Sequence, residues 1–224
     1  MKPKLDHRVR YLQIAFNYDL ALVHRVLPTL PHNERILIEA GTPYIKREGM
    51  RGVASMRALW RGHIVADMKV ADGAAGEVEM ARRSGANAVS VLGNSPTETL
   101  DLFVKHCNDN DVISMVDMIG VDDPLKMLRP MKSPPDVVIL HKGRDEESTR
   151  GKSIEYRHVN RIRSKFDSSI SAAGGVDLKE ARSAIFNGAN MVVVNLVRPG
   201  DPWQGISTEE DIAGIARKFL ETIE

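Results

Sequence analysis

The sequence has a single cysteine, almost no net charge and no long apolar run. Cys107 alone excludes an intrachain disulfide and a cysteine-only metal site, and it agrees with a reducing compartment. The 31 basic and 30 acidic residues leave a net charge of +1, so nothing indicates nucleic acid or an anionic membrane as a partner. No run approaches the roughly 18 apolar residues of a membrane span, and the amino terminus leads into no apolar segment of signal-peptide length. We therefore expect a soluble, cytoplasmic, globular protein.

The chain also lacks a linker rich in proline, glycine and serine, so we expect one domain over residues 1–224. Eight short apolar runs predict strands. Their starts fall about 25 residues apart, the length of one strand–loop–helix–loop unit. The predicted strands are Leu12–Phe16, Ile36–Ile38, Ile64–Ala66, Ala88–Leu92, Val112–Val116, Val137–Leu140, Ser169–Ala172 and Met191–Val194.

Helix signals lie between these strands. Helices are predicted over 73–84, from Ser95 as an N-cap followed by proline, from Asp177 as an N-cap with Glu180 three residues on, and over about 207–223. Two segments share the sequence Gly-Ala-Asn before a strand, which predicts a left-handed glycine cap and a tight turn. With no Gly-x-Gly-x-x-Gly after the first strand, the pattern favours a (β/α)8 TIM barrel over an open doubly wound sheet.

A cluster of charges follows the third predicted strand. Asp67 and Lys69 share a face because side chains alternate along a strand, and Asp72 is expected in the following turn. A surface ion pair would explain a single Asp-x-Lys. Two carboxylates flanking one lysine at a strand's carboxyl end, where α/β proteins bind ligands, favour a functional site.

The carboxyl ends of the other strands add further candidates, because these ends meet at one mouth of a barrel. Charged residues beside buried strands are costly unless they are paired or bind a metal. The candidate residues at these ends are Asn17, Glu39, Asp117, His141, Lys142, Arg144, Gly174, Gly175, Asn195 and Arg198.

Three groups of candidate residues indicate particular chemistry. Glu39 and Asp67 offer hard oxygen ligands suited to Mg²⁺, although Glu39 could instead cap a helix or form an ion pair. His141 is a candidate acid or base, although a lone histidine can be structural. Gly174–Gly175 precedes a predicted helix N-terminus, which indicates a phosphate site or only a tight turn. His106 and His158 fall on predicted helices and are expected at the surface.

Asp67-x-Lys69-x-x-Asp72 matches the signature of the orotidine monophosphate decarboxylase superfamily. The segments at 73–81 and 85–93 resemble one branch of it, which holds hexulose-6-phosphate synthase and 3-keto-L-gulonate-6-phosphate decarboxylase. The Ile-Pro pair that usually follows the second aspartate in the nucleotide decarboxylases is absent. The resemblance spans nearly the whole chain.

The resemblance implies roles for several residues. Glu39 and Asp67 match magnesium ligands of this branch, and Asp117 lies where the branch carries an acid that contacts substrate hydroxyls. The segment His141-Lys-Gly-Arg144-Asp is similar to one that supplies proton-donating groups in the ketogulonate decarboxylases. Asp72 would reach into a partner's site, which implies a homodimer with shared active sites.

The chain departs from the family pattern at two strand ends. The first strand usually ends in aspartate, and here it ends in Asn17, which removes one negative charge near Lys69. After the eighth strand the family usually has Gly-Arg, with the arginine on phosphate. This chain instead has Asn195 followed by leucine, and Arg198 could reach the phosphate from a shifted position.

Four functions follow, in order of preference. The first is a carbon–carbon lyase of the hexulose-6-phosphate synthase type, in which His141 removes a proton from ribulose 5-phosphate and the enediolate, stabilised by Mg²⁺ and Lys69, attacks formaldehyde. The second forms the enediolate by decarboxylating 3-keto-L-gulonate 6-phosphate, with Arg144 and His141 guiding reprotonation. The third is metal-free decarboxylation of orotidine monophosphate. The fourth is a catalytically silent barrel that binds a phosphorylated metabolite.

Overall fold

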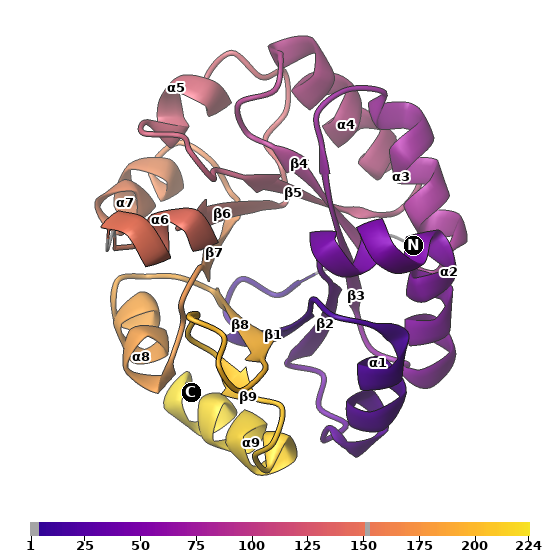
Figure 1. The fold of residues 1–224 in the computed structure, drawn as a ribbon. Coiled ribbons are helices and arrows are strands. Elements are labelled where there is room, and N and C mark those ends of the chain that lie inside the picture. Colours follow the sequence, from indigo (N-terminus) through magenta and orange to yellow (C-terminus); the bar gives the residue numbers. More distant parts are fainter. Residues whose placement is uncertain (1–4, 151–152) are drawn as a thin grey trace.

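The apolar runs form eight parallel strands that close into a barrel (Figure 1). The structure is a computed structural model that describes residues 5–150 and 153–224, so the first four residues of the amino terminus lie outside it. Each strand pairs with the next along the chain, and β1 pairs with β8 to close the ring, which confirms the predicted (β/α)8 fold. The strands are β1 Tyr11–Phe16, β2 Ile36–Ala40, β3 Ile64–Val70, β4 Ala88–Leu92, β5 Ile113–Asp117, β6 Val137–His141, β7 Ser169–Ala173, β8 Met191–Val197 and the short β9 Ile206–Ser207.

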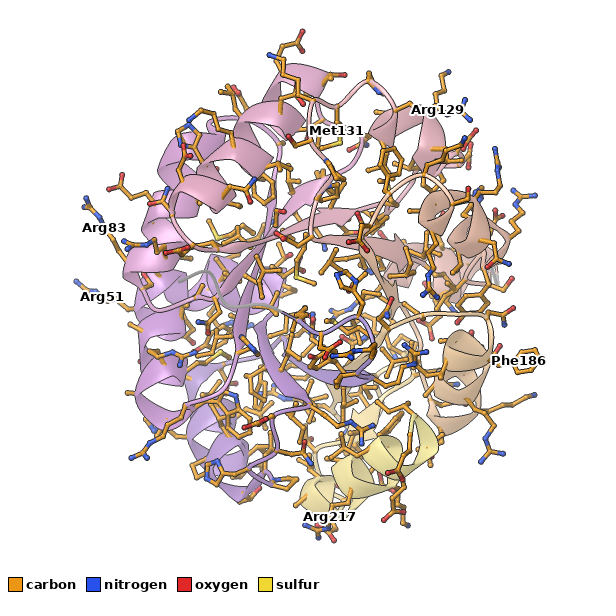
Figure 2. All side chains as sticks on the ribbon, turned by 180° about the vertical axis from the view of Figure 1, so that it is seen from behind. Arg51, Arg83, Arg129, Met131, Phe186 and Arg217 are labelled. Carbon is orange, nitrogen blue, oxygen red and sulfur yellow. The ribbon has the colours of Figure 1, made fainter. Side chains whose placement is uncertain are left out.

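Helices surround the strands (Figure 1). Charged side chains on the outer faces, including Arg51, Arg83, Arg129 and Arg217, project away from the barrel (Figure 2). Among the described residues, no helix combines the length and the apolar character that a membrane crossing requires. The helices are α1 Leu20–Val26, the 3-10 helix η1 Leu27–Thr29, α2 Thr42–Leu59, α3 Ala74–Arg83, α4 Thr97–Asp109, α5 Pro124–Leu128, α6 Arg144–Arg150, α7 Arg157–Arg163, α8 Leu178–Phe186 and α9 Ile212–Thr222.

The strands separate two apolar layers, because successive side chains point to opposite faces. On β1, Leu12, Ile14 and Phe16 face the helices and belong to the larger, outer core. Tyr11 and Ala15 face the barrel axis and belong to a second cluster inside the barrel. The other members of this inner cluster are Leu37, Val65, Ala88, Ile113, Met115, Val137, Ile139, Ala173, Met191 and Val193.

The amino-terminal segment closes one end of the barrel. Leu5 and Val9 pack against the inner cluster. His7 Nδ1 lies 3.1 Å from the hydroxyl of Ser169, at the start of β7, and its carbonyl accepts a hydrogen bond of 2.8 Å from Asn190. Apolar residues therefore fill the amino-terminal mouth, and the polar side chains gather at the other mouth.

The two Gly-Ala-Asn segments make the predicted turns. Gly85 and Gly188 have φ angles of +93° and +94°, a region that glycine adopts without strain. The asparagine that follows each turn then joins two strands. Asn87 Oδ1 accepts from a backbone N–H of β3 at 3.0 Å, and Asn190 Oδ1 accepts from one of β7 at 2.9 Å. The repeated sequence thus marks a repeated structural element.

The predicted helix caps are right at one position and wrong at another. Asp177 caps α8, since its Oδ1 accepts from the Glu180 N–H at 2.7 Å. Ser95 does not cap α4: the N-cap position is Pro96, and the Ser95 hydroxyl instead donates to the Val70 carbonyl at 3.4 Å. The buried serine hydroxyl is satisfied by the end of β3 and not by the helix.

The last helix begins later than predicted. Ser207 lies in β9, which pairs with the end of β8 through Val197. Helix α9 begins at Ile212, where Asp211 Oδ1 accepts from the Gly214 N–H at 2.9 Å. The chain between β8 and β9 is therefore a loop tied to the barrel at both ends.

Candidate active site

Inward-facing side chains at the carboxyl ends of the strands line a cavity of about 300 Å³. The alternation that directs Val65 inward on β3 also directs Asp67 and Lys69 there, and the polar ends of the other strands follow the same alternation. Nine of the candidate residues line this cavity. They are Asn17, Glu39, Asp67, Lys69, Asp117, His141, Arg144, Gly174 and Asn195.

The amine of Lys69 lies between two carboxylates. Its Nζ donates to Asp67 Oδ1 and Oδ2 at 3.0 and 2.9 Å, and to Asp117 Oδ2 at 2.7 Å. The lysine side chain is 22% exposed and that of Asp117 only 1% exposed. Burial alone would lower the pKa of Lys69, but the two carboxylates outweigh it and hold the pKa above its ordinary value. The amine is therefore a fixed positive charge in the cavity.

The sequence predicts Asp67 and Asp72 as the two acids that flank Lys69. Within the chain the second acid is instead Asp117, so this prediction for Asp72 was wrong. Asp72 is exposed in the turn after β3, as predicted for the turn itself. Strand β3 also continues to Val70 and does not end at Ala66. Lys69 has a φ of +48°, a conformation that costs a non-glycine residue about 1–3 kcal/mol, and its N–H donates to the Ser90 hydroxyl at 3.0 Å. The strained backbone at the end of the strand thus accompanies a lysine side chain that points toward Asp67 and Asp117.

Two hydroxyl residues that the sequence did not reveal hold Asp67 in place. The Ser90 hydroxyl donates to Asp67 Oδ1 at 2.7 Å, and the Thr42 hydroxyl lies 2.8 Å from Asp67 Oδ2. Ser90 occupies the inward position on β4 between two outward-facing valines, so the strand alternation was the signal that could have found it. With Lys69, these contacts fix both carboxylate oxygens.

Asp117 also binds His141, so the charges form a chain across β3, β5 and β6. His141 Nδ1 lies 2.9 Å from each Asp117 oxygen. Because an ionised carboxylate only accepts hydrogen bonds, the ring nitrogen is the donor. Burial alone would raise the pKa of Asp117, but His141 and Lys69 outweigh it and hold the pKa below its usual value. Burial likewise opposes charge on His141, and Asp117 raises the pKa of His141 above 6.5.

Glu39 is the second buried carboxylate of the site, 7% exposed at the end of β2. Gln13 Nε2 donates to Glu39 Oε2. Burial, together with the negative charge of Asp67, raises the pKa of Glu39 to about 7. Two carboxylates that repel each other in a buried site are the arrangement that a cation would relieve.

The residues around Glu39 fit a magnesium ion. Glu39 and Asp67 supply hard oxygens, and the buried Gln13 Oε1 has no hydrogen-bond partner. Within residues 5–150 and 153–224, no three His, Cys, Asp or Glu side chains gather as a closed metal site. Two carboxylates without a third ligand suit an ion that keeps several of its waters, as Mg²⁺ does.

The turn after β7 requires glycine at residue 174. Gly174 has a φ of +99°, and a Cβ there would lie 1.9 Å from the Lys142 carbonyl oxygen. Gly175 has a φ of +61°. The turn leads into the capped N-terminus of α8, so backbone N–H groups and the helix dipole both favour an anion here.

Neutral amides meet where β1 and β8 end. Asn17 Nδ2 donates to Asn195 Oδ1 at 3.0 Å. A Cβ on Gly41 would lie 2.1 Å from Asn17 Oδ1, so the glycine gives the amide its room. This pair ties β1 and β8 together without adding charge to this part of the cavity.

Arg198 is not among the described residues that line the cavity. Strand β8 continues to Val197, and Arg198 follows it. The guanidinium pairs with Asp19 at 2.6 Å and lies over the Tyr18 ring, 4.4 Å from its centroid. The sequence left open whether Arg198 reaches a phosphate, and here it is already bound to two other side chains.

Helix α6 places Arg144 and Asp145 at the rim of the cavity. The Arg144 guanidinium lies 4.7 Å from the centroid of the Trp203 ring, which belongs to the β8–β9 loop. Gln13, Thr42, Ser90 and Asp145 line the cavity without having been predicted. Gln13 and Ser90 are inward-facing strand residues that the alternation could have identified, whereas Thr42 and Asp145 lie in the first turns of α2 and α6, where no strand alternation applies.

The expectation for His158 was wrong. This side chain is buried, and its Nε2 lies 3.1 Å from Glu155 Oε2, so it belongs to the packing of α7 and not to the surface. An amphipathic pattern does not separate a buried histidine from an exposed one at a helix edge.

Comparisons with known proteins show the family and the fold of the chain. The model of the orotidine 5'-phosphate decarboxylase / HUMPS family matches residues 10–195. The bifunctional enzyme Fae/Hps of Methanocella arvoryzae is 33% identical over 218 residues, covering 95% of this chain and 53% of the relative. That of Methanothrix thermoacetophila is 33% identical over 215 residues, covering 95% and 52%. The chain therefore spans about half the length of the curated relatives it matches.

Solved structures share the fold. A 3-hexulose-6-phosphate synthase from Salmonella typhimurium has a TM-score of 0.81 at 23% identity, covering 95% of this chain and 98% of that one. A second 3-hexulose-6-phosphate synthase has a TM-score of 0.79 at 25% identity, covering 96% and 100%. With a family model that matches most of its length, the chain belongs to the orotidine 5'-phosphate decarboxylase / HUMPS family.

Proposed function

We propose that this protein is a carbon–carbon lyase of the hexulose-6-phosphate synthase type, which joins formaldehyde to ribulose 5-phosphate. The observation that carries the proposal is the Lys69 amine, fixed between Asp67 and Asp117 in a barrel cavity beside His141. A fixed cation stabilises the negative charge that develops when a sugar carbonyl becomes an enediolate. The Fae/Hps relatives support this choice of reaction.

His141 can carry the proton through the whole reaction. In its neutral form it takes the proton from the carbon beside the carbonyl, and Lys69 stabilises the enediolate that results. The enediolate carbon then forms the new bond to the formaldehyde carbon. The imidazolium returns the same proton to the former aldehyde oxygen, which becomes a hydroxyl, so no other acid or base is needed. Asp117 orients the ring and favours its charged form.

Glu39 and Asp67 would hold the magnesium ion. When bound, it supplies Lewis-acid polarisation of the sugar oxygens. The backbone N–H groups at Gly174 and Gly175, before α8, are the proposed phosphate ligands, and Asn17 and Asn195 are proposed to contact the sugar. Asp117 keeps a second role as a contact for substrate hydroxyls.

A second candidate is decarboxylation of 3-keto-L-gulonate 6-phosphate. The observation that favours it is the position of Arg144, which lines the cavity three residues after His141. In that reaction carbon dioxide leaves, and the imidazolium of His141 donates its proton to the enediolate carbon. The raised pKa of His141 suits a proton donor near neutral pH.

One coupled assay separates these functions. The protein is tested with ribulose 5-phosphate plus formaldehyde, with 3-keto-L-gulonate 6-phosphate and with orotidine monophosphate, each with magnesium and with a chelator. Magnesium-dependent condensation is expected. Turnover of the keto acid alone would select the second candidate, metal-independent turnover of the nucleotide would select orotidylate decarboxylation, and no turnover would leave a silent phosphate-binding barrel.

We further propose a homodimer with shared sites. Asp72 is exposed in the turn after β3, where a partner could meet it. The test mixes Lys69→Ala with Asp72→Asn under conditions that exchange subunits. Mixed dimers regain one complete site, so activity is expected to reappear, and a mixture as inactive as its two components would contradict shared sites.

A further inference from the structure

The Glu147 carboxylate occupies the space that a side chain at residue 175 would take. A Cβ at Gly175 would lie 2.6 Å from Glu147 Oε1, 2.7 Å from its Cδ and 2.8 Å from its Oε2. All three distances are shorter than real Cβ contacts, so only glycine lets the carboxylate approach the turn this closely. An anion already lies against the turn proposed to bind phosphate.

The β8–β9 loop holds Glu147 in this position. The Gln204 N–H donates to Glu147 Oε1 at 3.2 Å. One turn earlier on α6, Arg144 stacks on Trp203, the residue before Gln204. The loop itself is anchored, since Asp201 accepts from the Arg198 N–H at 2.7 Å and β9 pairs with β8. Helix α6 is therefore docked on the loop by a hydrogen bond and a cation–π contact.

We propose that Glu147 determines the affinity of this site for phosphoryl groups, because its carboxylate occupies the place that the phosphoryl group takes. This inference rests on the proposed phosphate role of the Gly174–Gly175 turn. Both groups are anions that accept hydrogen bonds from backbone N–H donors. Like charges a few ångströms apart in a partly buried site repel strongly, so the two do not share it.

Three consequences follow from this competition. A phosphorylated ligand must displace the Glu147 carboxylate, which frees the Gln204 N–H as a further phosphate ligand. Glu147 leaves together with its helix turn, so the Arg144–Trp203 contact breaks and Arg144 becomes available to the ligand. The measured affinity is lower than the intrinsic one by the fraction of molecules in which the carboxylate has already left.

Calorimetric titration with inorganic phosphate tests the proposal. Glu147→Gln keeps the shape and the acceptor oxygen but removes the charge, and it is expected to bind phosphate on the order of tenfold more tightly than the unaltered protein. Glu221→Gln makes the same change at an exposed position of α9 and is expected to leave the affinity unchanged. Equal or weaker phosphate binding by Glu147→Gln, or no detectable binding by either protein, would overturn the proposal.

Fluorescence reports whether α6 moves. Trp60 and Trp203 are the two tryptophans of the sequence, so Trp60→Phe leaves Trp203 as the reporter. Saturating phosphate is expected to change the Trp203 emission because Arg144 leaves the ring. Phosphate that binds with no change in emission would show that Arg144 stays on the Trp203 ring, and the proposed movement of α6 would be wrong.

Different results would contradict the role of Glu147 and the proposed reaction. If Glu147→Gln binds phosphate as the unaltered protein does while both turn over a sugar phosphate, the role of Glu147 is wrong and the enzyme reading stands. If the substitution tightens phosphate binding but no sugar phosphate is turned over, Glu147 competes with phosphate and the proposed reaction is wrong.

Discussion

On one side of the cavity, β3, β5 and β6 bring Lys69, Asp117 and His141 into a chain of charged hydrogen bonds. On the other side, β1 and β8 meet through the two neutral amides of Asn17 and Asn195. Burying charges costs several kcal/mol per ion unless their partners are well placed, whereas paired amides satisfy each other. The charged side thus has the residues for bond-making chemistry, and the neutral side suits recognition.

The two sides also differ in how closely they follow the family pattern. The charged side keeps the Asp-x-Lys-x-x-Asp signature, whereas the neutral side carries both departures, Asn17 and the shifted Arg198. The side that departs also holds the glycine turn and the β8–β9 loop that binds Glu147. Asn17 also bears on the charged side, because it takes the place of a carboxylate expected near Lys69, whereas the shifted Arg198 bears on substrate recognition alone.

Replacing Lys69 tests the charged side most severely. Lys69→Ala is expected to lower kcat by about 10³-fold, because the fixed cation at the developing oxyanion is lost. The barrel is expected to fold, since Asp67 keeps Ser90 and Asp117 keeps His141. Turnover and circular dichroism are measured together, with Lys126→Ala on the exposed face of α5 as the control. Full activity in a folded Lys69→Ala protein would remove the lysine from the mechanism.

Glu39 tests whether the charged side holds a metal. Glu39→Gln keeps the shape and a partner for Gln13 but is expected to weaken magnesium binding at least about tenfold, because one carboxylate ligand is lost. Manganese, followed by its electron spin resonance, reports binding without reference to turnover. The exposed Glu79→Gln on α3 is the matched control. Equal metal affinity in both variants would place the ion elsewhere.

The pH profile tests His141 and separates the two reactions. A synthase needs the neutral imidazole, so its rate is expected to rise with pH through the raised pKa, whereas a decarboxylase that donates a proton loses rate over that range. Asp117→Asn removes the charge that opposes the effect of burial, so the pKa of His141 is expected to fall below 6.5, with the rate profile moving to lower pH. Carbon-13 NMR of labelled histidine measures the pKa directly, and an unmoved value would contradict the pairing.

The same pair has a defined effect on stability. The raised pKa of His141 stabilises the fold in full below pH 6.5, and this contribution is lost as the pH rises through the folded pKa. The depressed pKa of Asp117 stabilises the fold above pH 3.8, and this contribution is lost as the pH falls. Both contributions are complete between these two values. In Asp117→Asn, chemical denaturation is expected to show a smaller free energy of unfolding in that window.

The strand alternation made much of the charged side predictable. Asp67 and Lys69 are two residues apart and share the cavity face. The inward-facing residues Glu39, Asp117 and His141, at or next to the ends of β2, β5 and β6, also line the cavity. The second acid on Lys69 was not predictable, because Asp117 is 48 residues away in sequence and reaches the amine only through the closure of the barrel. The hydroxyls of Ser90 and Thr42 escaped for a similar reason, since neither interrupts a helix or strand pattern.

On the neutral side the strand-end residues Asn17 and Asn195 were predictable, whereas the loop contacts were not. The contact of Glu147 with the Gly175 turn depends on how α6 docks on the β8–β9 loop, and no periodicity encodes that docking. Helix α9 was expected from about residue 207, but Ser207 pairs with β8 instead. The amphipathic residues of the predicted helix begin at Ile212, where α9 begins, so only the predicted start of the helix was wrong.

Arg198 gives the smallest expected effect and the finest distinction between the two sides. Its guanidinium is engaged by Asp19 and Tyr18, and exposed ion pairs contribute about 0.2–1 kcal/mol. Arg198→Ala is therefore expected to raise KM for the phosphorylated substrate by about fivefold or less, with kcat unchanged, as a loop perturbation would. Arg83→Ala, which removes the comparable Glu79 pair on α3, controls for the loss of a surface charge. A rise in KM of about a hundredfold corresponds to close to 3 kcal/mol. Such a rise would mean that Arg198 leaves Asp19 to bind the phosphate. The neutral side would then gain a positive charge only when the substrate is bound.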